Sequence, residues 1–70
     1  MRCRMVIGSP VDYDQLVVYI VANGTEIALV QKEEGATKVK IEFFEESVNS
    51  NVYLDDFIEV LNHAKKELLK

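Results

Sequence analysis

The chain has few of the residues that cross-link small domains or bind metal ions. Among its 70 residues there is one cysteine, Cys3, and one histidine, His63. A lone cysteine excludes a disulfide within the chain, and one cysteine with one histidine cannot supply the ligand set of a structural zinc site. Because a domain of this size has only a marginal core, the chain depends on good packing or on self-association for its stability.

Long apolar runs are also absent. The run at residues 16–22 is far shorter than the roughly 20 residues that a membrane-spanning helix needs. The apolar stretch within residues 1–7 is too short for a signal peptide and lacks a small-residue cleavage site. We therefore expect no membrane association and a cytoplasmic location, where a lone thiol stays reduced.

Proline and glycine are scarce, and they separate apolar segments. The chain has one proline and three glycines, and Asn23-Gly24 lies between two β-branched runs. An Asn-Gly pair in this position is a strong hairpin signal, because both residues tolerate a positive φ. The pattern predicts strands at residues 1–7, 16–22, 25–31 and 38–43.

The two-residue turn also predicts a register for this hairpin. The expected pairs are Ala22 with Thr25, Ile20 with Ile27, and Val18 with Leu29. The large aliphatic residues of these pairs then share one face, the expected core face. In the last strand, Val39, Ile41 and Phe43 alternate with polar residues and are expected to point inward.

The C-terminal segment has the pattern of an amphipathic helix from about Leu54 to Leu69. Its acidic residues come early and its lysines late, which complements the helix dipole. The residues expected to face the sheet are Leu54, Phe57, Ile58, Leu61, Ala64 and Leu68. The predicted fold is α+β: a single domain, residues 1–70, with a four-stranded antiparallel β-meander packed on one C-terminal helix.

No group of residues in the sequence predicts catalysis. Cys3 shares a strand face with Met5 and Ile7, which favours a buried and inert thiol, and His63 falls on the polar side of the helix. The adjacent carboxylate pairs lie in turns or at the helix start, where water solvates them. The glycines lie far apart, so no phosphate-binding loop is present. We expect a protein that is not an enzyme and needs no cofactor or metal.

The distribution of charge indicates a binding surface. Residues 41–64 hold six of the acidic residues and no lysine or arginine. These acidic residues, which we call the acidic strip, are Glu42, Glu45, Glu46, Asp55, Asp56 and Glu59. The electrostatic field of such a surface steers a basic protein partner toward it. The alternative is that these charges serve only solubility.

The second face of the predicted sheet is apolar as well. Its expected members, alongside Glu26, are Val17, Tyr19, Val21, Ala28 and Val30. One helix cannot cover both faces of a sheet, and exposed apolar patches often mark an interface. We expect a homodimer or a partner contact there, with Tyr19 as an anchor. The alternatives are an ordinary surface or cover by residues 11–15.

Several short motifs resemble small bacterial proteins of the uncharacterised or immunity type, which have a meander followed by a helix. They are Tyr13-Asp14-x-Leu16, Ile27-Ala28-x-Val30-x-x-Glu33-x-Gly35, Ile41-Glu42-Phe43 and Leu54-Asp55-x-Phe57-x-x-x-Leu61-x-x-Ala64-Lys65. The resemblance implies a cytoplasmic binder that neutralises a toxin domain, and it carries over no site residues. The order of elements also resembles the single-strand-binding domain of transcriptional coactivators.

These observations predict a small non-enzymatic protein-binding domain, and the resemblance implies an immunity or inhibitor type. The first alternative is a coactivator-like homodimer that binds single-stranded nucleic acid. That alternative is disfavoured because the chain is acidic and lacks the basic stripe that such binding requires. The second alternative is a structural accessory subunit.

Overall fold

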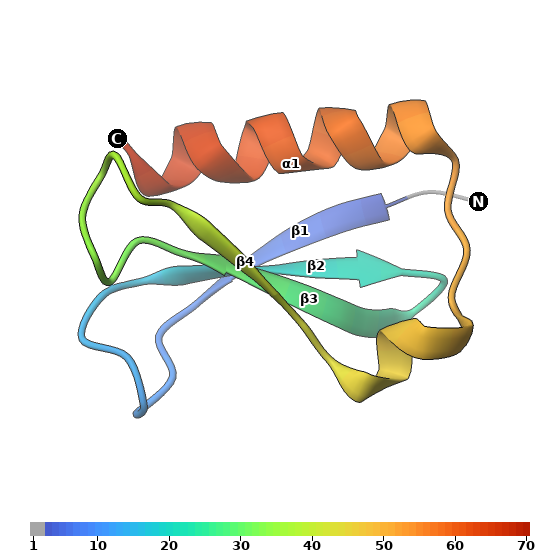
Figure 1. The fold of residues 1–70 in the computed structure, drawn as a ribbon, viewed down its shortest axis with the longest axis horizontal. Helices are drawn as coiled ribbons and strands as arrows, with labels where there is room; N and C mark the ends of the chain where they lie inside the picture. The colour runs from blue at the N-terminus through green and yellow to red at the C-terminus, as the bar shows by residue number, and fades with distance from the viewer. Residues whose placement is uncertain (1–2) are drawn as a thin grey trace.

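The computed structural model describes residues 3–70, which form an antiparallel sheet with one helix across a face (Figure 1). The strands are β1 (Cys3–Gly8), β2 (Val17–Ala22), β3 (Thr25–Gln31) and β4 (Lys40–Phe43), in the sheet order β1-β2-β3-β4. A 3₁₀ helix, η1 (Glu45–Asn49), and the helix α1 (Leu54–Leu68) follow. The predicted α+β class and meander are confirmed. Residues 1 and 2 of the predicted first strand lie outside the described residues.

The hairpin between β2 and β3 forms as the Asn-Gly pair predicts. Asn23 and Gly24 have φ values of 54° and 79°, the left-handed conformation that a tight hairpin turn requires. Ala22 pairs with Thr25, as expected. The turn is followed in β3 by Glu26, which pairs with Val21.

Beyond this point the register differs from the predicted one, because β3 contains a bulge. Ile20 pairs with Ala28 and Val18 pairs with Val30, so the predicted pairs of Ile20 with Ile27 and of Val18 with Leu29 are wrong. A bulge places two residues opposite one and reverses the alternation of the side chains that follow. Ala28 and Val30 therefore join the face under α1, and Leu29 moves to the opposite face.

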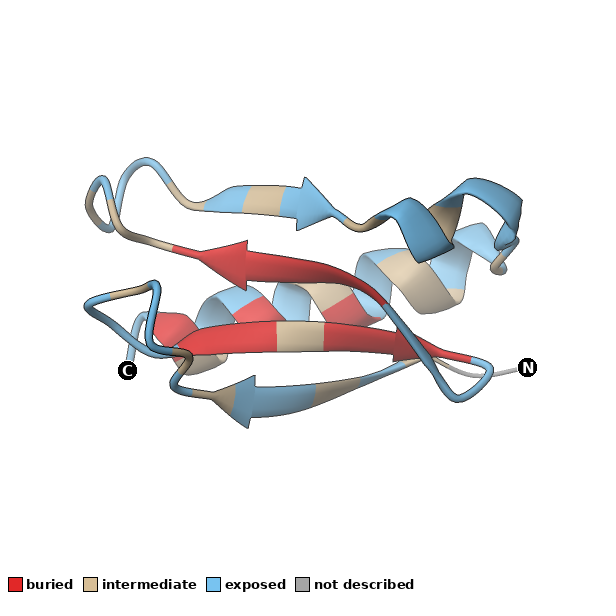
Figure 2. Ribbon diagram, turned by 90° about the horizontal axis from the view of Figure 1, so that it is seen from below, coloured by how far each residue is buried: buried red, intermediate tan, exposed pale blue. Residues whose placement is uncertain are grey.

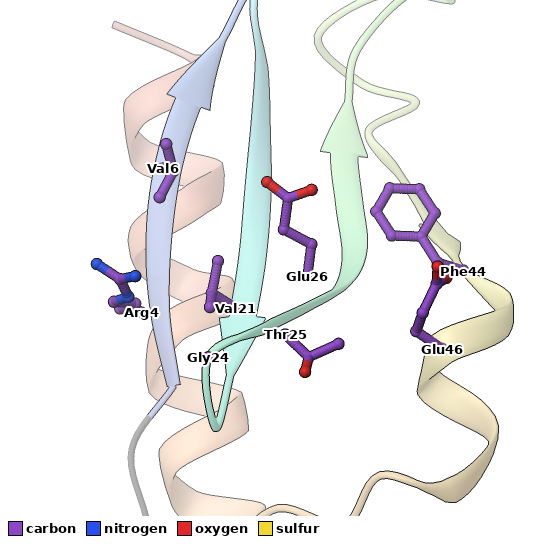
Figure 3. A pocket seen from close by; sticks show the side chains of 8 residues that line it. All are labelled: Arg4, Val6, Val21, Gly24, Thr25, Glu26, Phe44 and Glu46. Atoms are coloured by element: carbon purple, nitrogen blue, oxygen red, sulfur yellow. The ribbon is translucent and has the colours of Figure 1, made fainter.

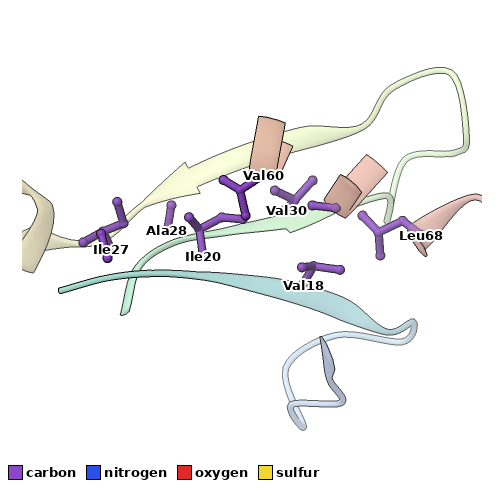
Figure 4. Packing of buried hydrophobic residues seen from close by; sticks show 9 residues of the cluster. Val18, Ile20, Ile27, Ala28, Val30, Val60 and Leu68 are labelled. Atoms are coloured by element: carbon purple, nitrogen blue, oxygen red, sulfur yellow. The ribbon is translucent and has the colours of Figure 1, made fainter. Parts of the chain in front are cut away.

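The core lies between α1 and the face of the sheet that it covers (Figure 4). Its buried members are Val18, Ile20 and Ala22 from β2, Ile27, Ala28 and Val30 from β3, and Val60, Ala64 and Leu68 from α1. Cys3 and Met5 of β1 pack against this cluster. The helix packs mainly over β1, β2 and β3.

The helix is rotated relative to its predicted orientation. Ala64 and Leu68 are buried as expected, but Val60 is also buried, whereas Leu54 is 70% and Ile58 47% exposed. The expectation that Leu54 and Ile58 face the sheet is therefore wrong. The physical reason is that α1 carries more apolar residues than one sheet face can bury. The stripe of Val60, Ala64 and Leu68 occupies the contact and leaves the neighbouring stripe outside.

Phe43 is a further departure from the predicted pattern. It lies opposite Ala28 on the face that carries the helix, yet it is 61% exposed. Because α1 packs mainly over the other strands and β4 is an edge strand, no element covers its aromatic ring.

Candidate functional site

The sheet face opposite α1, here called the far face, differs in composition from the predicted apolar patch. Val17, Tyr19 and Val21 belong to it, and Leu29 replaces the two predicted members from β3. Ala28 and Val30 are part of the core under α1, so their assignment to this face is wrong. Figure 2 shows this face, with buried residues along β2 and β3 although no helix covers them.

A polar network holds the segment between β1 and β2 against the far face. The Tyr13 hydroxyl donates to the Glu42 carboxylate of β4, with 3.0 Å to each oxygen. The Gln31 amide nitrogen donates to the same carboxylate at 2.8 Å. Because Tyr13 joins β1 to β2 and Glu42 lies on the opposite edge strand, the tyrosine side chain reaches across this face.

Glu33 anchors the same segment at its end. Its carboxylate accepts the backbone N–H of Asp14 at 2.8 Å and that of Gln15 at 3.0 Å. The Gln31 side-chain oxygen accepts the backbone N–H of Glu33 at 2.8 Å. Gln31, the buried polar residue of the sheet, thus has partners for both ends of its amide.

Aromatic rings complete the cover of the far face. The Tyr19 ring from β2 lies 6.4 Å from the Phe44 ring, centroid to centroid, with the planes tilted by 41°. Since Phe44 follows β4, this pair bridges β3, where Leu29 is 4% exposed. On its other side the Tyr19 ring lies over Gly8, where a Cβ would approach the ring to 2.6 Å. The chain therefore buries the apolar residues of this face largely with its own side chains.

One open hollow remains at the turn end of the far face (Figure 3). It measures about 720 Å³ and is lined by Arg4, Val6, Val21, Gly24, Thr25, Glu26, Phe44 and Glu46. The arginine lies on the β1 side, and Glu26 and Glu46 lie across from it. The lining has neither a nucleophile with an adjacent base nor an enclosed apolar wall, so it offers surface charge rather than a catalytic arrangement.

The structure distributes the acidic strip over both sides of the sheet. Glu42 is engaged by Tyr13 and Gln31 on the far face, and Glu46 lines the hollow there. Asp55, Asp56 and Glu59 lie on α1, which covers the other face. Glu45 is exposed at the start of η1. Within residues 3–70, no side-chain hydrogen bond engages Glu45 or Glu46, and the same holds for Asp55, Asp56 and Glu59.

Large exposed apolar side chains lie close in sequence to Glu45 and Glu46, and we call this region the η1 corner. It comprises Phe43, Glu45, Glu46, Val48 and Tyr53. Phe43, Val48 and Tyr53 are 61%, 79% and 66% exposed. Apolar side chains of this size are costly to leave in water, so their concentration beside two carboxylates marks a surface suited to contact.

The backbone of the η1 corner is fixed by local hydrogen bonds. The Phe44 N–H donates to the Ile27 carbonyl at 2.9 Å and ties the segment to β3. The Ser47 hydroxyl donates to the Phe44 carbonyl at 2.7 Å, and the Ser50 hydroxyl donates to the Glu46 carbonyl at 3.2 Å. These bonds favour a short 3₁₀ turn over a longer helix. Phe44 is directed toward Tyr19, and its neighbour Phe43 remains exposed.

Tyr53 occupies an unusual position at the start of α1. It is the N-cap residue and makes no side-chain capping bond. Serine, threonine, aspartate and asparagine are the residues that stabilise this position. The polar loop before the helix supplies such residues, but they lie too early in the chain to cap it. Sequence reasoning missed Tyr53, although a large aromatic residue directly before a predicted helix is a visible departure from capping rules.

Cys3 and His63, the candidates for nucleophilic chemistry, lie in different surroundings. Cys3 is half-buried on β1, where burial raises the pKa of its thiol and the Asp56 carboxylate adds to the effect. His63 is exposed on α1. A raised pKa leaves less of the reactive thiolate. Within residues 3–70, no group of three or more His, Cys, Asp or Glu residues is arranged to hold a metal ion.

The chain matches no protein-family model, no curated protein and no solved structure. The resemblances drawn from its short motifs stay predictions. In the part of the chain that the structure describes, no helix has the length and apolar character to cross a membrane.

Proposed function

We propose that this chain is a small non-enzymatic protein-binding domain that docks a basic, partly apolar partner at the η1 corner. The observation that carries the proposal is that Phe43, Val48 and Tyr53 are exposed in the same short stretch of chain as Glu45 and Glu46. No lysine or arginine interrupts residues 41–64, so the local field favours a cationic partner. An inhibitor or immunity-type protein would use such a surface to cover a basic target.

The N-cap position supports the same interpretation. A short polar residue at position 53 would satisfy an N–H group of α1, whereas Tyr53 offers an exposed ring and no cap. Proteins depart from local stability rules mainly where function requires it. Tyrosine also joins a large apolar ring to a hydroxyl, a combination common at interface anchors.

The test uses a fluorescein-labelled amphipathic helical peptide of leucine and lysine, with binding followed by anisotropy at low salt. We expect Tyr53→Ser to weaken binding about tenfold, which corresponds to about 1.4 kcal/mol. The same variant should stabilise the free protein by about 0.5–1 kcal/mol in urea unfolding, because serine caps α1. If Tyr53 had a purely structural role, its replacement would not lower the affinity for the peptide while raising the stability of the free protein.

Two charge-reversal variants distinguish binding at the η1 corner from attraction to the overall negative charge of the protein. Glu45→Lys with Glu46→Lys should weaken peptide binding about tenfold or more at low salt, with a smaller effect at high salt. The matched control is Asp12→Lys with Asp14→Lys, which makes the same charge change at exposed residues of the β1–β2 segment. Equal losses in both double variants, or unchanged binding in the first, would contradict the proposal.

A binding measurement with a labelled oligothymidylate distinguishes this function from the coactivator-like alternative. That alternative predicts binding of the single strand through the sheet. The far face instead carries Glu26 and Glu42, and its aromatic rings pack on the sheet. We expect no oligothymidylate binding under conditions in which the peptide binds, and tight single-strand binding would favour the alternative.

A further inference from the structure

Helix α1 carries a second apolar stripe outside the core, which we call the outer stripe. It consists of Leu54, Ile58, Leu61, Lys65 and Leu69, which follow one another at spacings of three or four residues. Residues at these spacings lie on one flank of a helix. Leu54, Ile58 and Leu69 are 70%, 47% and 40% exposed, and Leu61 packs partly against the core.

The opposite flank of the helix differs in character. Asp56, His63 and Glu67 occupy it, and Asp56 lies close enough to Cys3 of β1 to raise the pKa of the thiol. The outer stripe is the other flank of the helix, away from Asp56 and His63. It continues to the end of the helix, where Leu69 lies in a shallow hollow of about 590 Å³. The hollow is also lined by Asn62, Lys65, Lys66 and Lys70.

The helix is polarised in charge along its length. Its first turns carry Asp55, Asp56 and Glu59, and its end carries Lys65, Lys66 and Lys70. A second copy laid parallel would place like charges side by side, whereas an antiparallel copy places each acidic end beside a lysine-rich end. Opposite charges at neighbouring helix flanks set partner choice and orientation.

We propose that the outer stripes of two copies of this chain pack antiparallel in a two-fold dimer. The hollow at the lysine-rich end receives Leu54 and Asp55 of the second copy, and the two-fold axis passes near Leu61. The outer stripe begins at Leu54, directly after Tyr53 of the η1 corner, so the two proposed contacts adjoin at the start of α1. A single helix of about 22 Å supplies a contact at the small end of stable interfaces, which makes the dimer a weak one.

Sedimentation of the full chain from about 10 to about 500 µM tests the dimer, a range suited to weak association. We expect a concentration-dependent monomer–dimer equilibrium that Ile58→Glu shifts at least tenfold toward monomer. His63→Glu, an exposed change on the opposite flank, is the matched control and should leave the equilibrium within about twofold. Circular dichroism confirms that both variants fold. A wild-type monomer at every concentration, or a dimer indifferent to Ile58→Glu, would overturn the proposal.

Disulfide cross-linking tests the orientation in a Cys3→Ala background. Asn62→Cys lies near the proposed two-fold axis and should form a cross-linked dimer under mild oxidation. Asp55→Cys lies at the helix start, far from its own copy in an antiparallel pair, and should not. Efficient cross-linking of Asp55→Cys would indicate a parallel arrangement and refute the antiparallel one.

Discussion

Tyr13 covers part of the far face, although the residues around it in the sequence do not predict this contact. Its neighbours along the chain are polar, so the pattern predicts only a connection between strands. In the structure its hydroxyl reaches Glu42, which also binds Gln31, and the segment that carries it is fixed by Glu33. The far face is thereby closed by residues distant in sequence, which no local pattern reveals.

The ionisation of Tyr13 provides a test of this contact. Burial raises its pKa above the ordinary value of 10.0, and the hydrogen bond to Glu42 and the nearby carboxylates raise the pKa further. A raised folded-state pKa means that the native protein holds the phenolic proton more tightly than the unfolded chain does. The stabilisation is therefore present below the ordinary tyrosine pKa and is lost as the pH rises through the folded value.

We expect urea midpoints measured from about pH 8 to about pH 11 to fall more steeply for the wild type than for Tyr13→Phe. The difference between the two proteins should shrink as the phenol ionises. Tyr53→Phe, at an exposed tyrosine, serves as the control and should follow the wild type. Parallel curves for wild type and Tyr13→Phe would show that the hydroxyl contributes nothing to stability.

At the scale of elements, the orientation of α1 determines which residues are available outside the core. Apolar residues on two adjacent stripes gave the helix two plausible orientations, and the sequence alone could not choose between them. Val60 and Ile58 represent the two stripes, since both are β-branched helix residues, one 6% and the other 47% exposed.

We expect Val60→Ala to destabilise the protein by about 1–3 kcal/mol, because it leaves a cavity in the core. Ile58→Ala should cost less than about 1 kcal/mol at micromolar concentration, although it deletes a larger side chain. Thermal or urea unfolding of both variants distinguishes the two orientations. A larger loss for Ile58→Ala would mean that the helix faces the sheet through the other stripe.

The elements themselves were largely predictable from local chemistry. The Asn23-Gly24 turn and the alternation in β4 gave the hairpin and the last strand, and the helix pattern gave the bounds of α1 to within a residue. The bulge at Ile27 was not predictable, because it depends on which β3 residues the helix can bury. That single inserted residue moved Ala28 and Val30 to the core and thereby changed the expected interface.

Within the candidate site, the charge distribution was visible in the sequence, whereas the exposure of the apolar side chains was not. Glu45 and Glu46 belong to the predicted acidic strip. Phe43 was expected to point inward, and only the position of α1 over the other strands explains its exposure. Which apolar residues remain on the surface depends on tertiary cover, a property that no short window of sequence contains.

At the scale of the whole molecule, each face of the sheet has its own cover. Helix α1 covers one face, and Tyr13, Tyr19 and Phe44 contribute to closing the other. Among the large exposed apolar side chains, Phe43, Val48 and Tyr53 belong to the η1 corner, and Leu54, Ile58 and Leu69 belong to the outer stripe of α1. These two surfaces, rather than the far face, carry the proposed contacts with a partner and with a second copy.

Amide chemical-shift mapping of the nitrogen-15-labelled protein, titrated with the leucine–lysine peptide, tests this account most directly. The protein is held at low concentration, so that the outer stripe is free of a second copy. We expect the largest shifts at residues 43–53 and little change in β2 and in the centre of β3. Largest shifts at Val17, Tyr19 and Leu29 would contradict it, because they would show that the far face opens and binds.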